Sequence, residues 1–257
     1  MDAPRPSAVL LITGGSRGIG AATARLAAAS GWDIALNYRH DGAAAHAVAD
    51  EVRALGRRAW VLQADVALEA EVLAMFATLD QTLASAGARL AGLVNNAGVV
   101  DVAARVQDMS GARLQRMFAV NVLGTMWCAR EALKRMSTRH GGAGGAIVNL
   151  SSAAARLGAP GQYVDYAAAK GAVDVFTLGL AKEVAAEGVR VNAVRPGIID
   201  TDIHASGGQP ERAAQLAPQV PMQRAGSAAE VAAAIVWLLS DAASYTTGAL
   251  LDVSGGR

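Results

Sequence analysis

The chain has 257 residues, of which 53% are hydrophobic and 18% are charged, a composition that supports a large buried core. Its formal net charge of +1 gives no basic field that would attract nucleic acid or an anionic lipid surface. The single cysteine, Cys128, excludes an internal disulfide and a cysteine-based metal cluster, and it fits a reducing compartment.

No targeting or membrane segment is readable in the sequence. The first residues, MDAPRPS, contain one arginine, an aspartate and two prolines, and they lack the pattern of a signal peptide. The apolar stretch VAAAIVWLL at 231–239 is about half as long as a membrane span. We therefore expect a soluble, cytoplasmic protein. No linker, charge run or repeat divides residues 1–257, so we predict a single domain.

Short apolar runs alternate along the chain with longer Ala/Leu-rich segments of helical period, which is the pattern of parallel strands joined by crossover helices. We predict seven strands, at 8–13, 33–38, 59–64, 90–96, 145–151, 189–195 and 248–253. We predict helices near 18–30, 42–55, 69–86, 110–138, 164–187 and 228–239. Glycines stand where four of these helices should end, at Gly31, Gly56, Gly87 and Gly188.

These elements predict an α/β fold with a single Rossmann-type, doubly wound parallel sheet of about seven strands and helices on both faces. Several predicted strands are apolar throughout, as expected of strands covered on both faces. Residues 200–226 fit neither the strand nor the helix pattern and are rich in Gly, Pro and Gln. Because such long connections in compact domains are usually functional, we predict a substrate lid at about 200–226.

The stretch TGGSRGIG at 13–20 joins the first predicted strand to the first predicted helix. Free backbone N–H groups and the positive end of a helix suit a phosphate there, and Gly14, Gly18 and Gly20 let the backbone approach it without a Cβ. A nucleotide triphosphatase loop would need Lys and Ser/Thr after the last glycine, where this chain has Ala21 and Ala22. The spacing also differs from GxGxxG, and a plain glycine turn stays open as the alternative.

The spacing TGxxxGxG resembles that of the short-chain dehydrogenases/reductases, which bind NAD or NADP on a single Rossmann-type domain. Further stretches match the family in order, from Leu10 to Gly256: Asp65-Val66, Asn95-Asn96-Ala97-Gly98, Asn121, NLSS at 149–152, YAAAK at 166–170 and RPGIIDT at 195–201. The chain resembles in particular 3-oxoacyl-carrier-protein reductases and glucose dehydrogenase-like members. The resemblance implies these cofactor contacts: Gly14, Ser16, Arg17, Gly18, Ile19, Gly20, Asn37, Arg39, Asp65, Val66, Asn95, Ala97, Gly98, Tyr166, Lys170, Pro196, Gly197, Ile199 and Thr201.

The end of the second predicted strand bears on the choice between NAD and NADP. A carboxylate there would bind the ribose 2′-hydroxyl of NAD and repel a 2′-phosphate, but the strand ends in Asn-Tyr-Arg at 37–39. Arg39 and Arg17 can instead converge on that phosphate, so we predict NADP(H) rather than NAD(H). Two solvated surface arginines are the alternative. The resemblance implies that Asp65 contacts the adenine amine, and a helix cap is its alternative.

Tyr166 and Lys170 are four residues apart, which places both side chains on one face of a helix, one turn apart. A phenol has a reference pKa of about 10, and a nearby ammonium or an oxidised nicotinamide favours the phenolate. We therefore predict that Tyr166 exchanges the proton of a carbonyl or alcohol substrate while a nicotinamide transfers hydride. By resemblance Lys170 also binds the nicotinamide ribose. A chance Tyr/Lys pair on a surface helix is the alternative.

Two further catalytic residues are predicted. Ser152 ends a predicted strand, fourteen positions before Tyr166, an interval like that of the family, and it should hold the substrate oxygen. Ser151 would point to the opposite side of the strand. The resemblance implies that Asn121 holds a water linking Lys170 to solvent, and a buried asparagine that satisfies neighbouring backbone is the alternative.

Several functional questions stay open at this level. The four histidines show no metal-ligand spacing, so we predict no metal; His204, in the predicted lid, either touches substrate or lies on an exposed loop. An acyl thioester, a sugar, a steroid or a small ketone all stay open as substrates. A non-catalytic dinucleotide-binding sensor or scaffold on the same fold is the rival function. A homotetramer is implied by resemblance only.

Overall fold

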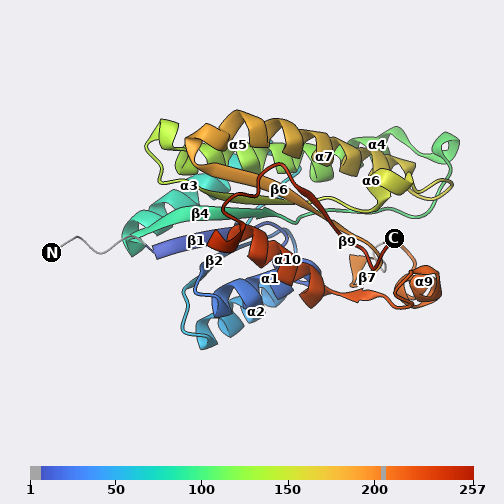
Figure 1. Ribbon diagram of the computed structural model, residues 1–257, viewed down its shortest axis with the longest axis horizontal. Helices are drawn as coiled ribbons and strands as arrows, with labels where there is room; N and C mark the ends of the chain where they lie inside the picture. Colours follow the sequence, from blue (N-terminus) through green and yellow to red (C-terminus); the bar gives the residue numbers. More distant parts are fainter. Residues whose placement is uncertain (1–6, 204–206) are drawn as a thin grey trace.

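The computed structural model describes residues 7–203 and 207–257. One sheet of seven parallel strands has the order β3-β2-β1-β4-β5-β6-β9 (Figure 1). Its strands are β1 (Ser7–Ile12), β2 (Asp33–Tyr38), β3 (Ala59–Gln63), β4 (Ala88–Asn95), β5 (Gly145–Leu150), β6 (Val189–Pro196) and β9 (Leu250–Val253). The seven strands predicted from hydrophobic patterning are thereby confirmed.

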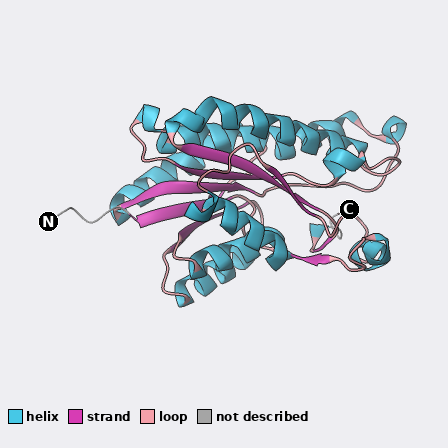
Figure 2. Cartoon of the chain, in the orientation of Figure 1, coloured by secondary structure: helices cyan, strands magenta, loops and turns pink. Residues whose placement is uncertain are grey.

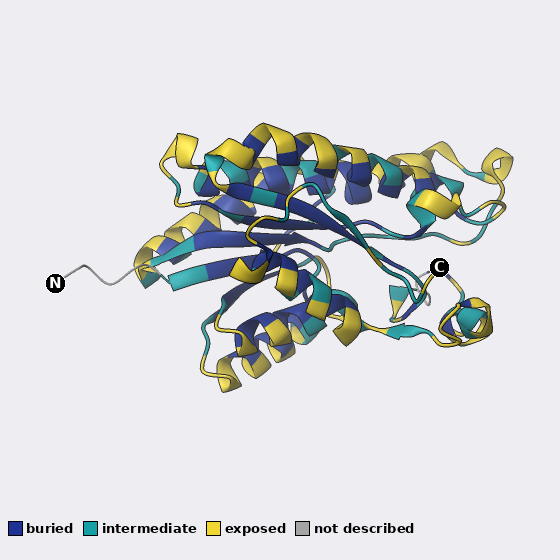
Figure 3. Ribbon diagram, in the orientation of Figure 1, coloured by how far each residue is buried: buried dark blue, intermediate teal, exposed yellow. Residues whose placement is uncertain are grey.

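Helices cover both faces of this sheet (Figures 1 and 2). On one face lie α3 (Glu69–Ala86), α5 (Gly124–Met136) and α7 (Val164–Val184), and on the other lie α1 (Gly18–Ala29), α2 (Gly42–Ala54) and α10 (Ala228–Leu239). The first layer packs around Phe76 and Ile147, the second around Leu36 and Ile235, and the strands between them are buried (Figure 3). The doubly wound Rossmann-type fold is confirmed.

The helix predicted at 110–138 is interrupted. It consists of α4 (Gly111–Phe118), a π-helical turn (Ala119–Leu123) and α5, followed by a 3-10 turn (Thr138–His140). Asn121 lies inside this turn, and its side-chain Nδ2 donates to the backbone carbonyl of Met117 at 3.0 Å. Thr125 Oγ1 donates to the backbone carbonyl of Asn121 at 3.1 Å. Such π turns interrupt helices mostly at functional sites, and a periodicity argument does not reveal them.

The strand order reverses between β1 and β4, so the loops that follow these strands diverge and leave a crevice at the carboxyl end of the sheet. At this end lie α6 (Ala154–Leu157) and α9 (Arg212–Leu216) (Figure 1). The predicted lid also contains a 3-10 turn (Ala217–Gln219), and its two ends are joined where β7 (Ile199–Asp200) pairs with β8 (Gly226–Ser227). The prediction for His204 lies outside the described residues.

Further short 3-10 turns lie at Val106–Asp108, Ala185–Glu187 and Asp241–Ala243. The second of these ends the helix predicted at 164–187. Within residues 7–203 and 207–257, no helix has both the length and the apolar character needed to cross a membrane.

Candidate active site

The turn between β1 and α1 is built for close approach. Gly14 and Gly18 have φ values of +61° and +54°, in the left-handed region that favours glycine. A Cβ at Gly20 would lie 2.5 Å from the carbonyl oxygen of Gly14, so only glycine fits. The side chain of Arg17, the N-cap of α1, makes no capping hydrogen bond, and Thr201 lies 3.6 Å from where a Cβ of Gly18 would be. These features suit an anionic group at the start of α1.

Two residues outside the predicted site hold this turn. Asn96 Nδ2 donates to the carbonyls of Thr13 and Gly14, both at 2.9 Å. Thr13 Oγ1 in turn accepts the backbone N–H groups of Asn96 and Ala97, both at 3.0 Å. The loop after β4 is thereby fixed to the loop after β1. The paired asparagines in the NNAG stretch were the sequence signal for this role.

Asn37 was predicted to contact the cofactor, and in the structure its side chain is bonded to backbone groups. Its side chain is buried, and its Nδ2 donates to the carbonyls of Leu62 and Ala64 at 3.3 and 3.0 Å. Its Oδ1 accepts the N–H of Gly14 at 3.3 Å. Because backbone groups occupy the amide, Asn37 supports the glycine turn. Val66, another predicted contact, is also buried, and its carbonyl would be 2.8 Å from a Cβ at Gly124.

Asn95 is a second predicted contact that the structure places in the interior. It pairs in register with Asn149 of β5, and its Nδ2 donates to Asn149 Oδ1 at 2.9 Å. Asn149 Nδ2 then donates to Thr177 Oγ1 of α7 at 2.9 Å. Asn95 Oδ1 is buried without a hydrogen-bond partner among the described residues. Asn95 therefore joins β4, β5 and α7 beneath the site, because its strand position turns the side chain into the core.

Two of the three residues predicted at the adenosine end, Arg39 and Asp65, contact each other. Arg39 Nε lies 2.9 Å from Asp65 Oδ2, with the arginine side chain 48% exposed. Asp65 Oδ1 accepts the N–H of Ala67 at 2.9 Å, whereas the N-cap of α3 is Leu68, so Asp65 does not cap that helix. Arg17 is exposed and has no ion pair within the described part of the chain.

Tyr166 and Lys170 meet on α7 as the spacing predicts. Lys170 Nζ is 5.6 Å from the centre of the Tyr166 ring and donates to the carbonyl of Leu150 at 2.6 Å. Both residues line a cavity of about 520 Å³. Other predicted site residues line the same cavity: Ile19, Gly98, Ser152, Pro196, Gly197, Ile199 and Thr201. The structure thus brings three of the four catalytic candidates, Ser152, Tyr166 and Lys170, to one cavity with parts of the predicted cofactor site.

Burial governs the electrostatics of this pair. It raises the pKa of Tyr166, and the hydrogen bond with Ser152 only partly opposes that rise. Burial also lowers the pKa of Lys170 to about 8, against the opposing charge of Asp174. We expected the Lys170 ammonium to lower the pKa of the phenol. The pKa of Tyr166 is raised instead, because desolvation is the largest effect on it. Tyr166 is therefore a protonated phenol at neutral pH, ready to donate.

Ser151 and Ser152 are separated as the strand pleat predicts. Ser151 is buried, and its Oγ donates to the carbonyl of Lys170 at 3.2 Å. Ser152 Oγ accepts the N–H of Ala154 at 3.1 Å and forms the hydrogen bond with Tyr166. Ser152 is thus the serine placed to orient an oxygen beside the phenol.

Asn121 is fully buried in the π turn and lies close to Lys170. Its Nδ2 donates to the carbonyl of Val99 at 3.0 Å, and its Oδ1 accepts the N–H of Val99 at 3.2 Å. A Cβ at Gly98 would be 2.9 Å from Asn121 Oδ1 and 3.6 Å from Lys170 Nζ. The side chain satisfies neighbouring backbone, as the alternative interpretation described, and a role in holding water stays a prediction.

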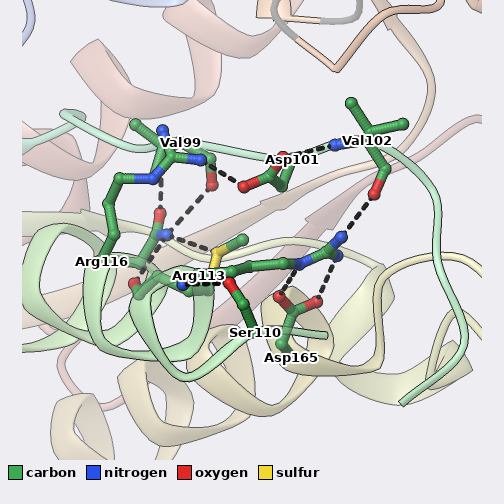
Figure 4. Close-up of polar contacts among 9 residues, drawn as sticks. Val99, Asp101, Val102, Ser110, Arg113, Arg116 and Asp165 are labelled. Atoms are coloured by element: carbon green, nitrogen blue, oxygen red, sulfur yellow. Dashed lines mark hydrogen bonds and ion pairs between the residues drawn. The ribbon is translucent and has the colours of Figure 1, made fainter. Parts of the chain in front are cut away.

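A buried ion pair fixes the start of α7 (Figure 4). Arg113 Nε and Nη2 donate to the two carboxylate oxygens of Asp165 at 2.8 and 3.1 Å, and the two side chains are 10% and 1% exposed. Arg113 also donates to the carbonyl of Val102 at 2.5 Å. Arg116, on α4, pairs with Asp101 in the loop after β4. Because Asp165 precedes Tyr166, this pair anchors both the loop after β4 and the turn of α7 that carries Tyr166.

The lowered pKa of Lys170 makes a stability prediction. Between its folded pKa of about 8 and its ordinary value of 10.5, the unfolded chain binds more protons at this site, so the unfolding free energy rises with pH. Relative to Lys170→Met, the wild type should gain about 2 kcal/mol between about pH 7.5 and about pH 10, measured by urea unfolding. Lys182→Met, on an exposed position of the same helix, is the control. A flat or falling difference contradicts the burial argument.

Known proteins resemble this chain over almost its whole length. A family model described as enoyl-(acyl carrier protein) reductase matches residues 14–257. The uncharacterized oxidoreductase YgfF of Escherichia coli (strain K12) is 53% identical over 250 residues, which cover 97% of this chain and 100% of that protein. The 3-oxoacyl-[acyl-carrier-protein] reductase of Synechocystis sp. (strain ATCC 27184 / PCC 6803 / Kazusa) is 39% identical over 96% of each chain.

A solved structure agrees with these relatives. The short chain dehydrogenase from Burkholderia cenocepacia J2315, in complex with NADP, has a TM-score of 0.86 and 33% identity, and the match covers 98% of this chain and 99% of that one. Sequence and fold therefore point the same way, and the chain belongs to the short-chain dehydrogenase/reductase family of oxidoreductases.

Proposed function

We propose that this protein interconverts a carbonyl compound and a secondary alcohol with NADP(H), using Tyr166 as the general acid and base. One observation carries the proposal, the surroundings of Tyr166. The phenol is hydrogen-bonded to Ser152 and lies one helical turn from Lys170. It lines a cavity that also reaches Ile19 and Thr201. A phenol so placed can give a proton to, or take one from, a group bound in the cavity.

The chain's own residues divide the work around the reacting oxygen. A bound nicotinamide supplies or accepts the hydride. Tyr166 Oη holds the proton, and its raised pKa keeps that proton in place until a stronger base forms beside it. Ser152 orients the oxygen by a second hydrogen bond. Lys170, held by the carbonyl of Leu150, brings a positive charge near the phenolate that remains after proton transfer.

The preference for NADP(H) is supported by charge at the adenosine end. Residues 37–39 contain no carboxylate, and Arg39 and Arg17 are both exposed. The partner of Arg39 is Asp65, so a 2′-phosphate would compete with that carboxylate for the guanidinium rather than meet a bare cation. The relative from Burkholderia cenocepacia is described in complex with NADP.

Turnover separates this proposal from a non-catalytic sensor or scaffold. With NADPH and a panel of ketones and aldehydes, the loss of NADPH absorbance should report reduction, and Tyr166→Phe should lower kcat by about 10²–10⁴-fold because general acid catalysis is lost. NADPH binding, followed by fluorescence, should change less than about twofold. Tyr245→Phe, at an exposed tyrosine, is the matched control. A wild type that binds NADPH and reduces no member of the panel would instead be the sensor.

Cofactor choice has its own prediction. NADPH should bind more tightly than NADH, and Arg39→Ala should weaken NADPH binding by about 10–100-fold, as expected for one charge-assisted contact. NADH serves as the internal control, because it has no 2′-phosphate and its affinity should change little. Equal affinities for the two cofactors, or an unchanged ratio in Arg39→Ala, would show that the guanidinium does not read this phosphate.

We also propose a homotetramer. Apolar side chains are exposed on α4, on the π turn and on α7: Leu114, Phe118, Leu123, Val175 and Leu178. Light scattering should give four times the chain mass of 26.1 kDa. Val175→Glu should lower this mass, since a charge would be buried without a partner, whereas Leu55→Glu, at the exposed C-cap of α2, should leave it unchanged. A monomeric wild type would contradict the assembly.

A further inference from the structure

The cavity that holds Tyr166 has an uneven charge distribution. The charged side chains that line it belong to Lys170, Arg212 and Arg257. Among the described residues, no aspartate or glutamate lines it. Lys170 has its place beside the phenol, and Arg212 comes from α9, in the segment predicted as a lid. The positive charge of Arg212 has no such role.

Arg212 is held in place by uncharged partners. Its Nη1 donates to Gln209 Oε1 at 2.7 Å and its Nη2 to Gln162 Oε1 at 2.6 Å. The guanidinium lies over the ring of Tyr163, 5.1 Å from the ring centre, and the Tyr163 hydroxyl donates to the same Gln209 oxygen at 3.2 Å. The planar group is therefore oriented from two sides and over one face, while its charge is not neutralised.

Some other partly buried arginines are ion-paired, while Arg190 directs its guanidinium to four backbone carbonyls instead. Arg113 pairs with Asp165 and Arg195 pairs with Asp174, in each case at 2.8 Å. Arg212 forms no ion pair in the described part of the chain, and two hydrogen bonds use only part of its five N–H donors. A fixed cation without a carboxylate partner, at the wall of a cavity, is arranged to receive an anion.

The position of Arg212 separates this anion from the cofactor phosphates. Its partners Gln162 and Tyr163 immediately precede α7, within one helical turn of Tyr166. Among the described residues, its hydrogen bonds and ring contact are with Gln162, Tyr163 and Gln209, not with the glycine turn at 13–20 or with Arg39, where the phosphates are expected. Figure 1 shows α9 and the start of α7 at the same end of the sheet, with the carboxyl ends of the strands between them. The guanidinium therefore faces the substrate part of the cavity.

We propose that Arg212 selects substrates that carry a carboxylate in addition to the reacting carbonyl or alcohol. The inference rests on the proposed function and names its substrate class: an oxo acid, or the corresponding hydroxy acid. The guanidinium fork matches the two oxygens of a carboxylate. Apolar side chains line the same cavity, including Val100, Leu157 and Ile203, and they suit a hydrocarbon chain joining the two polar ends.

Matched ketones test the inference. The probes are 4-oxopentanoate, 5-oxohexanoate and 6-oxoheptanoate, each beside its neutral methyl ester, with NADPH as reductant. At least one acid should have a KM about tenfold or more below that of its ester. Arg212→Gln should raise the KM of that acid by about 10–100-fold, the value of a charge-assisted pair, with a much smaller effect on the ester. Arg212→Lys, which keeps the charge and loses the fork, should lie between. Arg25→Gln, at an exposed arginine of α1, is the control.

Calorimetry with the NADP⁺-loaded protein gives a second readout that does not need turnover. At least one of the three acids should bind to the wild type more tightly than its methyl ester and lose that affinity in Arg212→Gln. If no ketone is reduced but this binding pattern holds, the proposed function is wrong and the role of Arg212 stands. If acids and esters are reduced equally, or Arg212→Gln weakens both equally, the role of Arg212 is overturned and the proposed function stands. No reduction together with no carboxylate binding overturns both.

Discussion

The site depends on holding a buried lysine ammonium beside a half-buried phenol. Lys170 is 4% exposed, and its burial costs enough to lower its pKa to about 8. The ammonium is tolerated because the carbonyl of Leu150 accepts its hydrogen bond at 2.6 Å. The negative charge of Asp174, one turn further along α7, also favours the charged form of Lys170. The same desolvation raises the pKa of Tyr166. Both groups are thus poised by burial, and their relative position has to be fixed by the surrounding structure.

Polar links between elements provide that fixation. The Arg113–Asp165 pair holds the first turn of α7 to α4. A chain of side-chain hydrogen bonds from Asn95 through Asn149 to the Thr177 hydroxyl holds α7 to β4 and β5. Each link is buried and directional, so a shift of α7 would leave polar groups unpaired at a cost of about 1–3 kcal/mol each. Apolar packing alone would allow small displacements of the helix at a lower cost.

Sequence patterning was sufficient for the sheet, the major helices and the spacing of Tyr166 and Lys170, because those depend on local periodicity and short motifs. It was not sufficient where side-chain direction or distant partners decide. The π turn is hidden within a continuous helical pattern at 110–138, and α6 and α9 are too short to show a period. The inward direction of the Asn37 and Asn95 side chains, and their partners on neighbouring strands, could likewise not be seen in the sequence. Arg113 and Asp165 are 52 positions apart, and no local signal joins them.

Charge couples the proposed ligands to the state of Lys170. With a pKa of about 8, this lysine loses its charge more readily than an exposed one, and neighbouring cations favour that loss while anions oppose it. A carboxylate held by Arg212 adds negative charge to a cavity in which no described Asp or Glu side chain takes part. Its binding would therefore favour the ammonium form of Lys170, the form that stabilises a phenolate at Tyr166. In the proposed reaction, substrate recognition at α9 and proton transfer at α7 would then be connected through the electrostatics of one shared cavity, without any movement of the helices.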